Sequence, residues 1–194
     1  MSISRRRFLT ISAMTGATTA FNSLDIFSKP LRAETRPGYS LLVFATNWGY
    51  TGSWDDFCSR IREHGYDGAE IWFPEDAARQ KEIFSAFQKH GLQMGFLVGG
   101  SDKDPKKHFE QFKASVEGAA ASKPVYINCH SGRDFFSFEQ NKLFIDLTTS
   151  LSRRSGVPIY HETHRSRILY SAPVARQFMK ELPDLRITFD VSHW

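Results

Sequence analysis

Residues 93–130 read QMGFLVGGSDKDPKKHFEQFKASVEGAAASKPVYINCH. The segment begins with a short apolar run, QMGFLV (93–98), and ends with another, VYINC (125–129). Between them a helical pattern runs over 105–122, with Pro105 near its first turn, a position that proline favours. A strand, a helix and a second strand in this order predict a parallel βαβ unit.

The same alternation continues on both sides of this segment. Apolar runs begin near residues 40, 69, 93, 125, 159 and 186, about 29 residues apart. Ser53 is a candidate N-cap, and Gly65, Gly91 and Gly156 are candidate helix ends. The pattern therefore predicts an α/β protein with six strands and five helices. The helices are expected at 53–64, 77–90, 105–122, 137–154 and 172–182.

Two architectures fit this pattern, a doubly wound open sheet and a (β/α)₈ TIM barrel. No glycine-rich phosphate loop follows the first strand, where Thr46–Tyr50 reads TNWGY, which weighs against a nucleotide-binding open sheet. A barrel needs about 250 residues, so two βα units of roughly 60 residues in total are lacking. We therefore expect an incomplete TIM barrel over residues 34–194, from a C-terminally truncated sequence, or else a chain that forms homo-oligomers across its open sheet edges.

Residues 1–33 carry the whole formal net charge of +4, because they hold five basic residues and one acidic residue. The stretch Ser4–Leu9 reads SRRRFL and precedes a weakly apolar, Thr- and Ser-rich segment. Paired arginines followed by Phe-Leu resemble a twin-arginine export signal, read by the twin-arginine translocase. We therefore expect export to the periplasm. The alternative is a disordered basic tail.

The rest of the chain is electrically balanced, so nothing in its net charge favours nucleic acid as a partner. No apolar run is long enough to predict a stable membrane span. Two cysteines, Cys58 and Cys129, are too few for a disulfide scaffold or a cysteine-rich zinc module.

Polar residues gather at the ends of the predicted strands, where a TIM barrel carries its active site. These residues are Asn47, Trp48, Glu70, Trp72, Asn128, His130, His161–Arg165 and Asp190–Trp194. His64, His90 and His108 lie instead on predicted helices or at their ends, and we expect structural roles for them.

Side chains alternate along a strand, so Glu162 and His164 share one face, and Asp190 lies on the corresponding face of the last strand. Ile187 and Phe189 are expected on the opposite, helix-covered face. Two inward carboxylates are costly to bury unless they are paired or bind a metal ion. The sequence thus leaves two interpretations: a site for Mn²⁺, Mg²⁺, Co²⁺ or Zn²⁺, or an ion pair of Glu162 with Arg165 or Arg167.

His161–His164 (HETH) and Phe189–Trp194 (FDVSHW) resemble the xylose isomerase-like TIM-barrel superfamily, and more closely its sugar phosphate isomerases and epimerases. Asn47-Trp48, the stretch Gly65–Glu70 (GYDGAE) and Asn128–His130 support the resemblance, which covers about residues 39–194.

The resemblance implies that Glu162 is a metal ligand and also the catalytic acid/base, and that Asp190 is a second ligand. It implies that His193 contacts substrate oxygens, and that His130 and Glu70 line the pocket. The implied reaction is proton transfer next to a sugar carbonyl through an enediolate. We add His164 and Trp48 as substrate-binding candidates from their places at the strand ends.

The sequence departs from the family pattern in two respects. Ligands on strands 7 and 8 have no counterpart here, and Ile168 stands where ketose 3-epimerases carry a second glutamate. Three alternatives therefore stay open: an exported sugar-binding module that stacks sugars on Trp48, Trp72 or Trp194, an inactive fragment of a barrel, and an endonuclease IV-like phosphodiesterase.

Overall fold

The computed structural model describes residues 40–193. The predicted export signal at residues 1–33 and Trp194 lie outside the described residues. No helix within the described range combines the length and the apolar character needed to cross a membrane.

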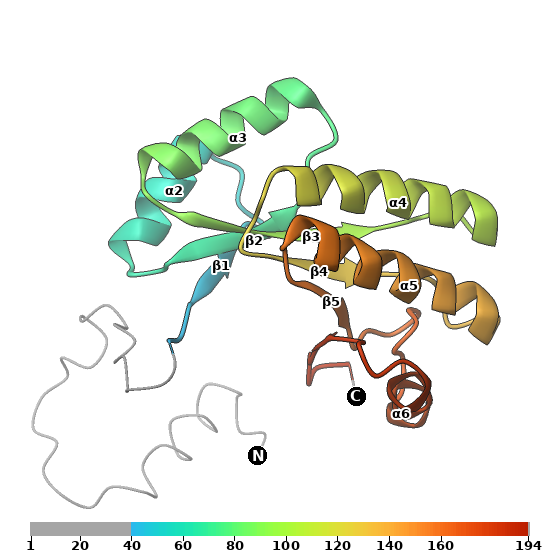
Figure 1. The fold of residues 1–194 in the computed structure, drawn as a ribbon. Coiled ribbons are helices and arrows are strands. Elements are labelled where there is room, and N and C mark those ends of the chain that lie inside the picture. Colours follow the sequence, from blue (N-terminus) through green and yellow to red (C-terminus); the bar gives the residue numbers. More distant parts are fainter. Residues whose placement is uncertain (1–39, 194) are drawn as a thin grey trace, which may run out of the picture. The chain divides into compact units, whose positions relative to one another are not determined.

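Strands and helices alternate along the described chain, as the sequence predicts (Figure 1). The strands are β1 (Phe44–Thr46), β2 (Gly68–Trp72), β3 (Gln93–Gly99), β4 (Tyr126–His130), β5 (Ile159–Glu162) and β6 (Ile187–Thr188). The helices are α2 (Trp54–Glu63), α3 (Ala77–Lys89), α4 (Pro105–Ala121), α5 (Phe138–Ser155) and α6 (Ala172–Glu181).

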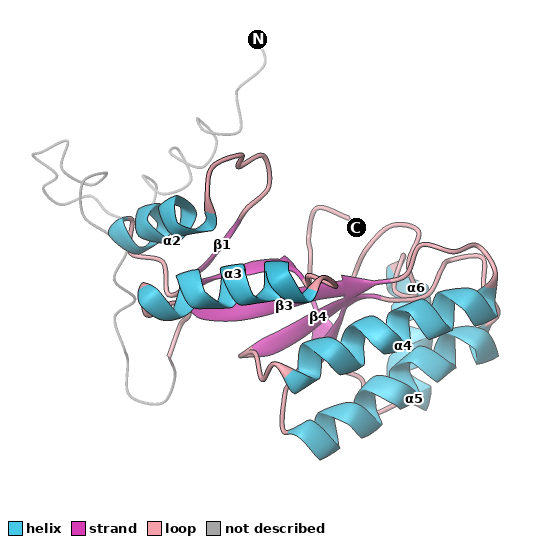
Figure 2. Cartoon of the chain, turned by 90° about the horizontal axis from the view of Figure 1, so that it is seen from above, coloured by secondary structure: helices cyan, strands magenta, loops and turns pink. Residues whose placement is uncertain are grey.

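The six strands form one parallel sheet in the order β1-β2-β3-β4-β5-β6. A doubly wound sheet reverses its strand order at a switch point, and no reversal occurs among these strands. Right-handed crossovers between successive parallel neighbours place every helix on the same face of the sheet. Figure 2 shows α3, α4 and α5 along that face. The prediction of an incomplete (β/α)₈ barrel with six strands and five helices is therefore confirmed.

Local sequence explains where the helices begin and end. Ser53, Asp76 and Asp104 each accept a hydrogen bond from the backbone N–H three residues later, which satisfies an otherwise unpaired donor. Ser137 and Gln140 form a reciprocal capping box at the start of α5. Gly156 ends α5 with a φ of 74°, a left-handed conformation that glycine adopts without steric cost.

The first and last strands are shorter than predicted. Residues 40–43 are not in a strand, and Leu41 and Leu42 are exposed. Pairing of β1 with β2 starts at Phe44, because β2 begins opposite it at Gly68. The N–H of the preceding residue, Val43, donates to the side chain of Asp67 (Oδ2, 2.7 Å). The prediction of a strand over 186–190 with a helix-covered Phe189 is wrong, since β6 ends at Thr188 and Phe189 is 61% exposed.

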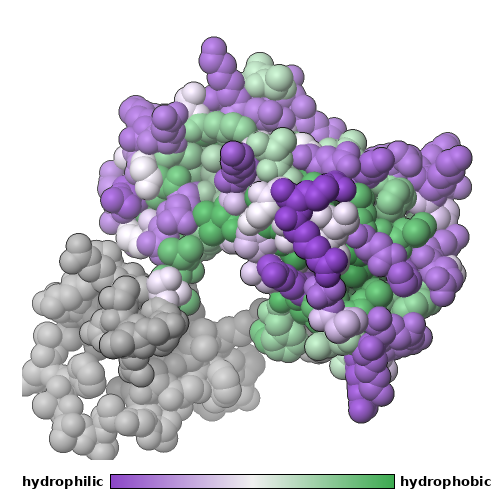
Figure 3. All heavy atoms as spheres, in the orientation of Figure 1, coloured by the Kyte–Doolittle hydropathy of each residue, from purple (hydrophilic) through white to green (hydrophobic). Residues whose placement is uncertain are grey.

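The hydrophobic core lies between the sheet and the helices. Its largest members are fully buried phenylalanines, Phe87, Phe96, Phe112 and Phe144. Each stabilises the fold by about 1.5–3 kcal/mol relative to an exposed position. Figure 3 shows hydrophilic side chains over the helical surface and hydrophobic ones between them.

The three histidines outside the strand ends have structural positions, as predicted. His64 and His90 are the C-cap residues of α2 and α3. His108 is fully buried on α4, packs edge-on against Phe136 and Phe144, and its Nδ1 donates to the carbonyl of Asp102 at 2.8 Å.

Candidate metal centre and cavity

The carboxyl ends of the strands surround a cavity of about 400 Å³. Its polar and aromatic lining comprises Trp48, Glu70, Tyr126, Asn128, His130, Glu162, Thr188, Phe189 and Asp190. The cavity therefore brings together five of the seven predicted site residues, from segments next to β1, β2, β4, β5 and β6. The other two, His164 and His193, lie close to Glu162 and Asp190 respectively.

Glu162, the last residue of β5, is 8% exposed. Its Oε2 accepts hydrogen bonds from Asn128 Nδ2 at 2.5 Å and from His130 Nε2 at 3.0 Å. Burial alone would raise the Glu162 pKa, but the hydrogen bonds and charge of these neighbours outweigh it, so the pKa is lowered. Within the described residues Glu162 forms its ion pair with His130, while Arg165 and Arg167 donate to His193 and to the Gly100 carbonyl, so the predicted alternative of a direct arginine pair with Glu162 is wrong.

Asp190 follows β6 and is anchored through its main chain. Its N–H donates to Thr163 Oγ1 at 2.8 Å, and the same hydroxyl lies 3.2 Å from the Asp190 carbonyl. Its Oδ1 accepts the N–H of Ser192 at 2.7 Å. The hydrogen bonds from Ser192 are the main cause of the lowered Asp190 pKa, so the group is a carboxylate at neutral pH.

Among residues 40–193, two groups of three side chains could each hold a metal ion, with ligand atoms that lie within 4.8 Å of one another. The first comprises His130, Glu162 and His164, and the second Glu162, Asp190 and His193. Glu162 is common to both. Carboxylate and imidazole groups suit Mg²⁺, Mn²⁺, Co²⁺ or Zn²⁺, so this donor set fits a divalent cation.

Glu70 lines the same cavity as Glu162 and is close enough to feel its charge. Burial raises its pKa and the charge of Glu162 raises it further, while hydrogen bonds from Tyr126 and Asn128 partly oppose the shift. Glu70, Gly95 and Tyr126 stand opposite one another on β2, β3 and β4. Because a Cβ at Gly95 would lie 2.6 Å from Tyr126 Cζ, the bare glycine is what lets the tyrosine ring cross β3 to reach Glu70.

Asn128 and Thr163 were noted among the polar residues at the strand ends, but no role in the site was predicted for either of them. Asn128 is 1% exposed and its amide contacts Glu162 and Glu70, so it holds both carboxylates in place. Its position two residues before His130 on one strand would have placed it on the cavity face. Thr163 carries no such signal, because its role depends on the pairing of β5 with the chain after β6.

The aromatic residues differ in exposure. Trp48 is 68% exposed at the cavity, and Trp72 is 47% exposed with its ring edge-on to His130 at 5.2 Å. Trp194, the third tryptophan of the predicted sugar-stacking set, lies outside the described residues.

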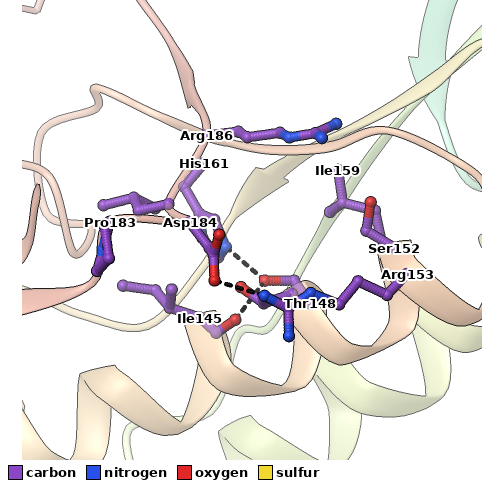
Figure 4. A pocket seen from close by; sticks show the side chains of 11 residues that line it. Ile145, Thr148, Ser152, Arg153, Ile159, His161, Pro183, Asp184 and Arg186 are labelled. Carbon is purple, nitrogen blue, oxygen red and sulfur yellow. Dashed lines mark hydrogen bonds and ion pairs between the residues drawn. The ribbon is translucent and has the colours of Figure 1, made fainter.

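His161 points away from this cavity, as strand alternation predicts. It contacts Thr148 of α5 and borders a second cavity of about 220 Å³ (Figure 4). The Thr148 hydroxyl donates to the Ile145 carbonyl, so His161 Nε2 carries the hydrogen and donates to Thr148 Oγ1 at 2.8 Å. Its Nδ1 then accepts from Ser131 Oγ at 2.6 Å. Complete burial lowers the His161 pKa to about 3.

We expect His161 to make the fold sensitive to acid. The unfolded chain takes up a proton at this residue below its ordinary pKa of about 6.5, whereas the folded chain does so only near 3. The stability that depends on neutral His161 is thus fully present above about pH 6.5 and is lost as the pH falls from there toward 3. Between pH 7.5 and 5 the wild type should lose about 2 kcal/mol more unfolding free energy than His161→Gln, measured by urea denaturation.

His64→Gln serves as the control, because His64 is exposed at a helix end. It should keep the acid sensitivity of the wild type. Parallel pH curves for the wild type and His161→Gln would contradict this prediction.

The sequential parallel strands, the helices on one face and the polar carboxyl ends define a protein of the TIM-barrel class. Residues 58–194 match the family model described as xylose isomerase-like TIM barrel. Since the match spans more than half of the chain, the protein belongs to this family.

Solved structures show the same fold. The chain resembles 3-keto-D-glucoside 4-epimerase YcjR from E. coli, with a TM-score of 0.59 and 16% identity over 76% of this chain and 66% of that one. It also resembles a probable 3-DHS dehydratase, AsbF, from Bacillus anthracis, with a TM-score of 0.56 and 15% identity over 79% of this chain and 64% of that one. A third similar structure is a xylose isomerase-like TIM barrel protein from Mycobacterium smegmatis in complex with magnesium, with a TM-score of 0.55 and 13% identity over 77% of this chain and 64% of that one.

The chain spans less than two thirds of the length of each of these structures. A search of curated proteins found no match.

Proposed function

We propose that this chain carries the site of a metal-dependent isomerase or epimerase that acts on a sugar or sugar phosphate. One observation carries the proposal: Glu162, buried beside the cavity, is shared by two groups of carboxylate and imidazole side chains. The 4-epimerase and the magnesium complex among the similar structures support it.

The chain's own residues would divide the work. Glu162 is ionised at neutral pH because of its neighbours, so it can accept a proton from the carbon next to the carbonyl. Glu162 and Asp190 would hold the divalent ion, which when bound supplies a Lewis acid that polarises that carbonyl. Glu70, His130, His164 and His193 offer hydrogen-bonding groups to the hydroxyls of a sugar, and Trp48 offers an exposed ring to its apolar face.

The fold alone does not select the reaction, since one of the similar structures is a probable dehydratase. The test is incubation of the protein with Mn²⁺ and a panel of aldoses, ketoses and their phosphates in D₂O. Deuterium incorporation next to the carbonyl, with formation of the isomeric sugar, would support the proposal. Loss of water from the substrate would indicate a dehydratase, and binding without exchange would indicate a sugar-binding module.

Export by the twin-arginine translocase to the periplasm is a separate proposal, supported by Ser4–Leu9 (SRRRFL). We expect the double variant Arg5→Lys, Arg6→Lys to stay in the cytoplasm, because the translocase reads the arginine pair. Cell fractionation with immunoblotting measures this, and Arg32→Lys is the control that should still be exported. Appearance of the double variant in the periplasm would show that the signal is misassigned.

A further inference from the structure

Two arginines, Arg133 and Arg167, lie side by side at the carboxyl end of the sheet, on the loops that follow β4 and β5. Arg133 Nη2 donates to the backbone carbonyl of Ser101 at 3.0 Å, and Arg167 Nη1 donates to that of Gly100 at 3.2 Å. Because the two carbonyls belong to consecutive residues after β3, they bring the guanidinium groups together. Both groups are cations at neutral pH, since arginine keeps its proton in this range.

The main chain holds the two arginines in these positions. The N–H of Ile168 donates to the carbonyl of Ser131 at 3.2 Å, which links the loop after β5 to the loop after β4. A Cβ added to Gly132 would lie 2.6 Å from Ile168 Cγ1, so the two loops are in close contact. Arg133 follows Gly132 and Arg167 precedes Ile168, so this contact fixes their backbones next to each other. A site that is formed before its ligand arrives loses less entropy on binding.

Contacts within the described part of the chain do not account for these two charges. None of the ion pairs among residues 40–193 includes Arg133 or Arg167. An arginine side chain carries several N–H donors, and each of these two donates to a loop carbonyl through one of its nitrogens. Arg133 Nε is buried and has no acceptor among the described residues. Neighbouring like charges repel each other, and an anion bound by both arginines would relieve that repulsion.

The arginine pair lies near the candidate metal centre. Burial and the charge of Arg133 lower the pKa of Arg167 to about 10, and the charge of Glu162 partly opposes this shift. The N–H of Arg167 also donates to the carbonyl of His164 at 3.2 Å. Since water and salt screen charges over about 10 Å, Glu162 and Arg167 lie within the span of one small substrate molecule.

We propose that Arg133 and Arg167 form an anion-binding subsite, and that the substrate which reaches Glu162 is a sugar with a phosphate or a carboxylate group. Guanidinium groups present parallel N–H donors that match the oxygens of both anions. This inference rests on the proposed function and narrows its substrate class to anionic sugars. Binding energy from such a remote group can orient the reacting carbon next to Glu162.

The first test measures anion binding to the full chain without metal, with inorganic phosphate and acetate as the probes. Titration calorimetry should show that Arg133→Gln and Arg167→Gln each weaken binding of the preferred anion by about 10–100-fold, as expected for loss of a charge-assisted hydrogen bond. Tighter binding of phosphate would indicate a sugar phosphate, and tighter binding of acetate a sugar acid. Arg62→Gln, an exchange of an exposed arginine on α2, is the matched control and should bind like the wild type.

The second test measures deuterium exchange with Mn²⁺ on two matched pairs, ribose 5-phosphate against ribose and glucuronate against glucose. The wild type should prefer the anionic member of at least one pair, and the arginine variants should lose that preference. Melting curves confirm that each variant is folded. Arg167→Lys, which keeps the charge but not the parallel N–H groups, replaces Arg167→Gln if the glutamine variant is not, and should still bind the anion more weakly than the wild type.

The outcomes separate this inference from the proposed function. Exchange on the neutral sugars that equals exchange on the anionic ones would overturn the inference and leave the proposed function standing. A wild type that binds neither probe, or arginine variants that bind as tightly as the wild type, would also overturn it. Anion binding that depends on both arginines, without exchange on any sugar, would overturn the proposed function and leave the anion-binding subsite standing.

Discussion

Glu162→Gln abolishes measurable Mn²⁺ binding and lowers deuterium exchange by about 10²–10⁴-fold, the range expected for loss of a general acid/base group. The substitution keeps the shape of the side chain and removes its charge. Because Glu162 belongs to both groups of candidate ligands, no alternative group of three remains among the described residues. Titration calorimetry measures the affinity, and nuclear magnetic resonance measures the exchange.

The fold should survive this substitution. A glutamine oxygen can still accept hydrogen bonds from Asn128 and His130, which now hold Oε2 of the carboxylate. Glu82→Gln, an exposed exchange of the same type on α3, is the control and should change neither measurement. Unchanged metal content of purified Glu162→Gln, measured by mass spectrometry, would refute the ligand assignment.

Gly68→Ala should destabilise the protein by about 3 kcal/mol or more, which corresponds to a fall in Tm of roughly 6–12 °C for a chain of this size. Gly68 begins β2 between Phe44 of β1 and Gln93 of β3. A Cβ here would lie 2.1 Å from the Gln93 carbonyl oxygen and 2.1 Å from Phe44 Cε1. The phenylalanine ring can move aside, but the backbone oxygen can move only if β3 does.

Gly91→Ala is the matched control for this prediction. Gly91 has a φ of 62°, and a Cβ added there would meet no atom within 4 Å. The alanine variant should therefore lose only the free energy needed to hold a non-glycine residue in the left-handed conformation, about 1–2 kcal/mol. Thermal melting of the two variants compares them directly, and equal losses would mean that the close approach at Gly68 is relieved at little cost.

The order of strands and helices could be predicted from the sequence, because apolar runs and capping residues are local signals. The ends of β1 and β6 could not, because a strand lasts only as long as its neighbour pairs with it. Leu41 and Leu42 are as apolar as the residues that follow them, yet β2 has no residue opposite them.

The candidate site was predictable where strand alternation alone decides the direction of a side chain. The inward direction of Glu162, the last residue of β5, was found in this way, whereas Asp190 lies beyond the end of β6 and is positioned by its hydrogen bonds with Thr163. The Tyr126–Glu70 contact was not, because it depends on the register of three strands and on the missing side chain of Gly95. The position of Arg133 beside Arg167 depends on the contact between two loops, which no periodicity reveals.

The stretch Gly65–Glu70, which supports the family resemblance, proves to be largely architectural. Gly65 has a φ of 81° where the chain leaves α2. Asp67 bonds to Val43 and to Gln93, so it links the starts of the first three strands. Only Glu70 reaches the cavity.

The sequential strand order also has a kinetic consequence. Every strand pairs with its immediate predecessor along the chain, so each pairing closes a loop of only about 30 residues. Such a sheet can grow one strand at a time as the ribosome releases the polypeptide, at about 5–20 residues per second. Asp190 and His193 emerge last among the described residues. Affinity for the proposed cation should therefore appear only after residue 193 has left the ribosome, several seconds after β1 and β2 have been able to pair.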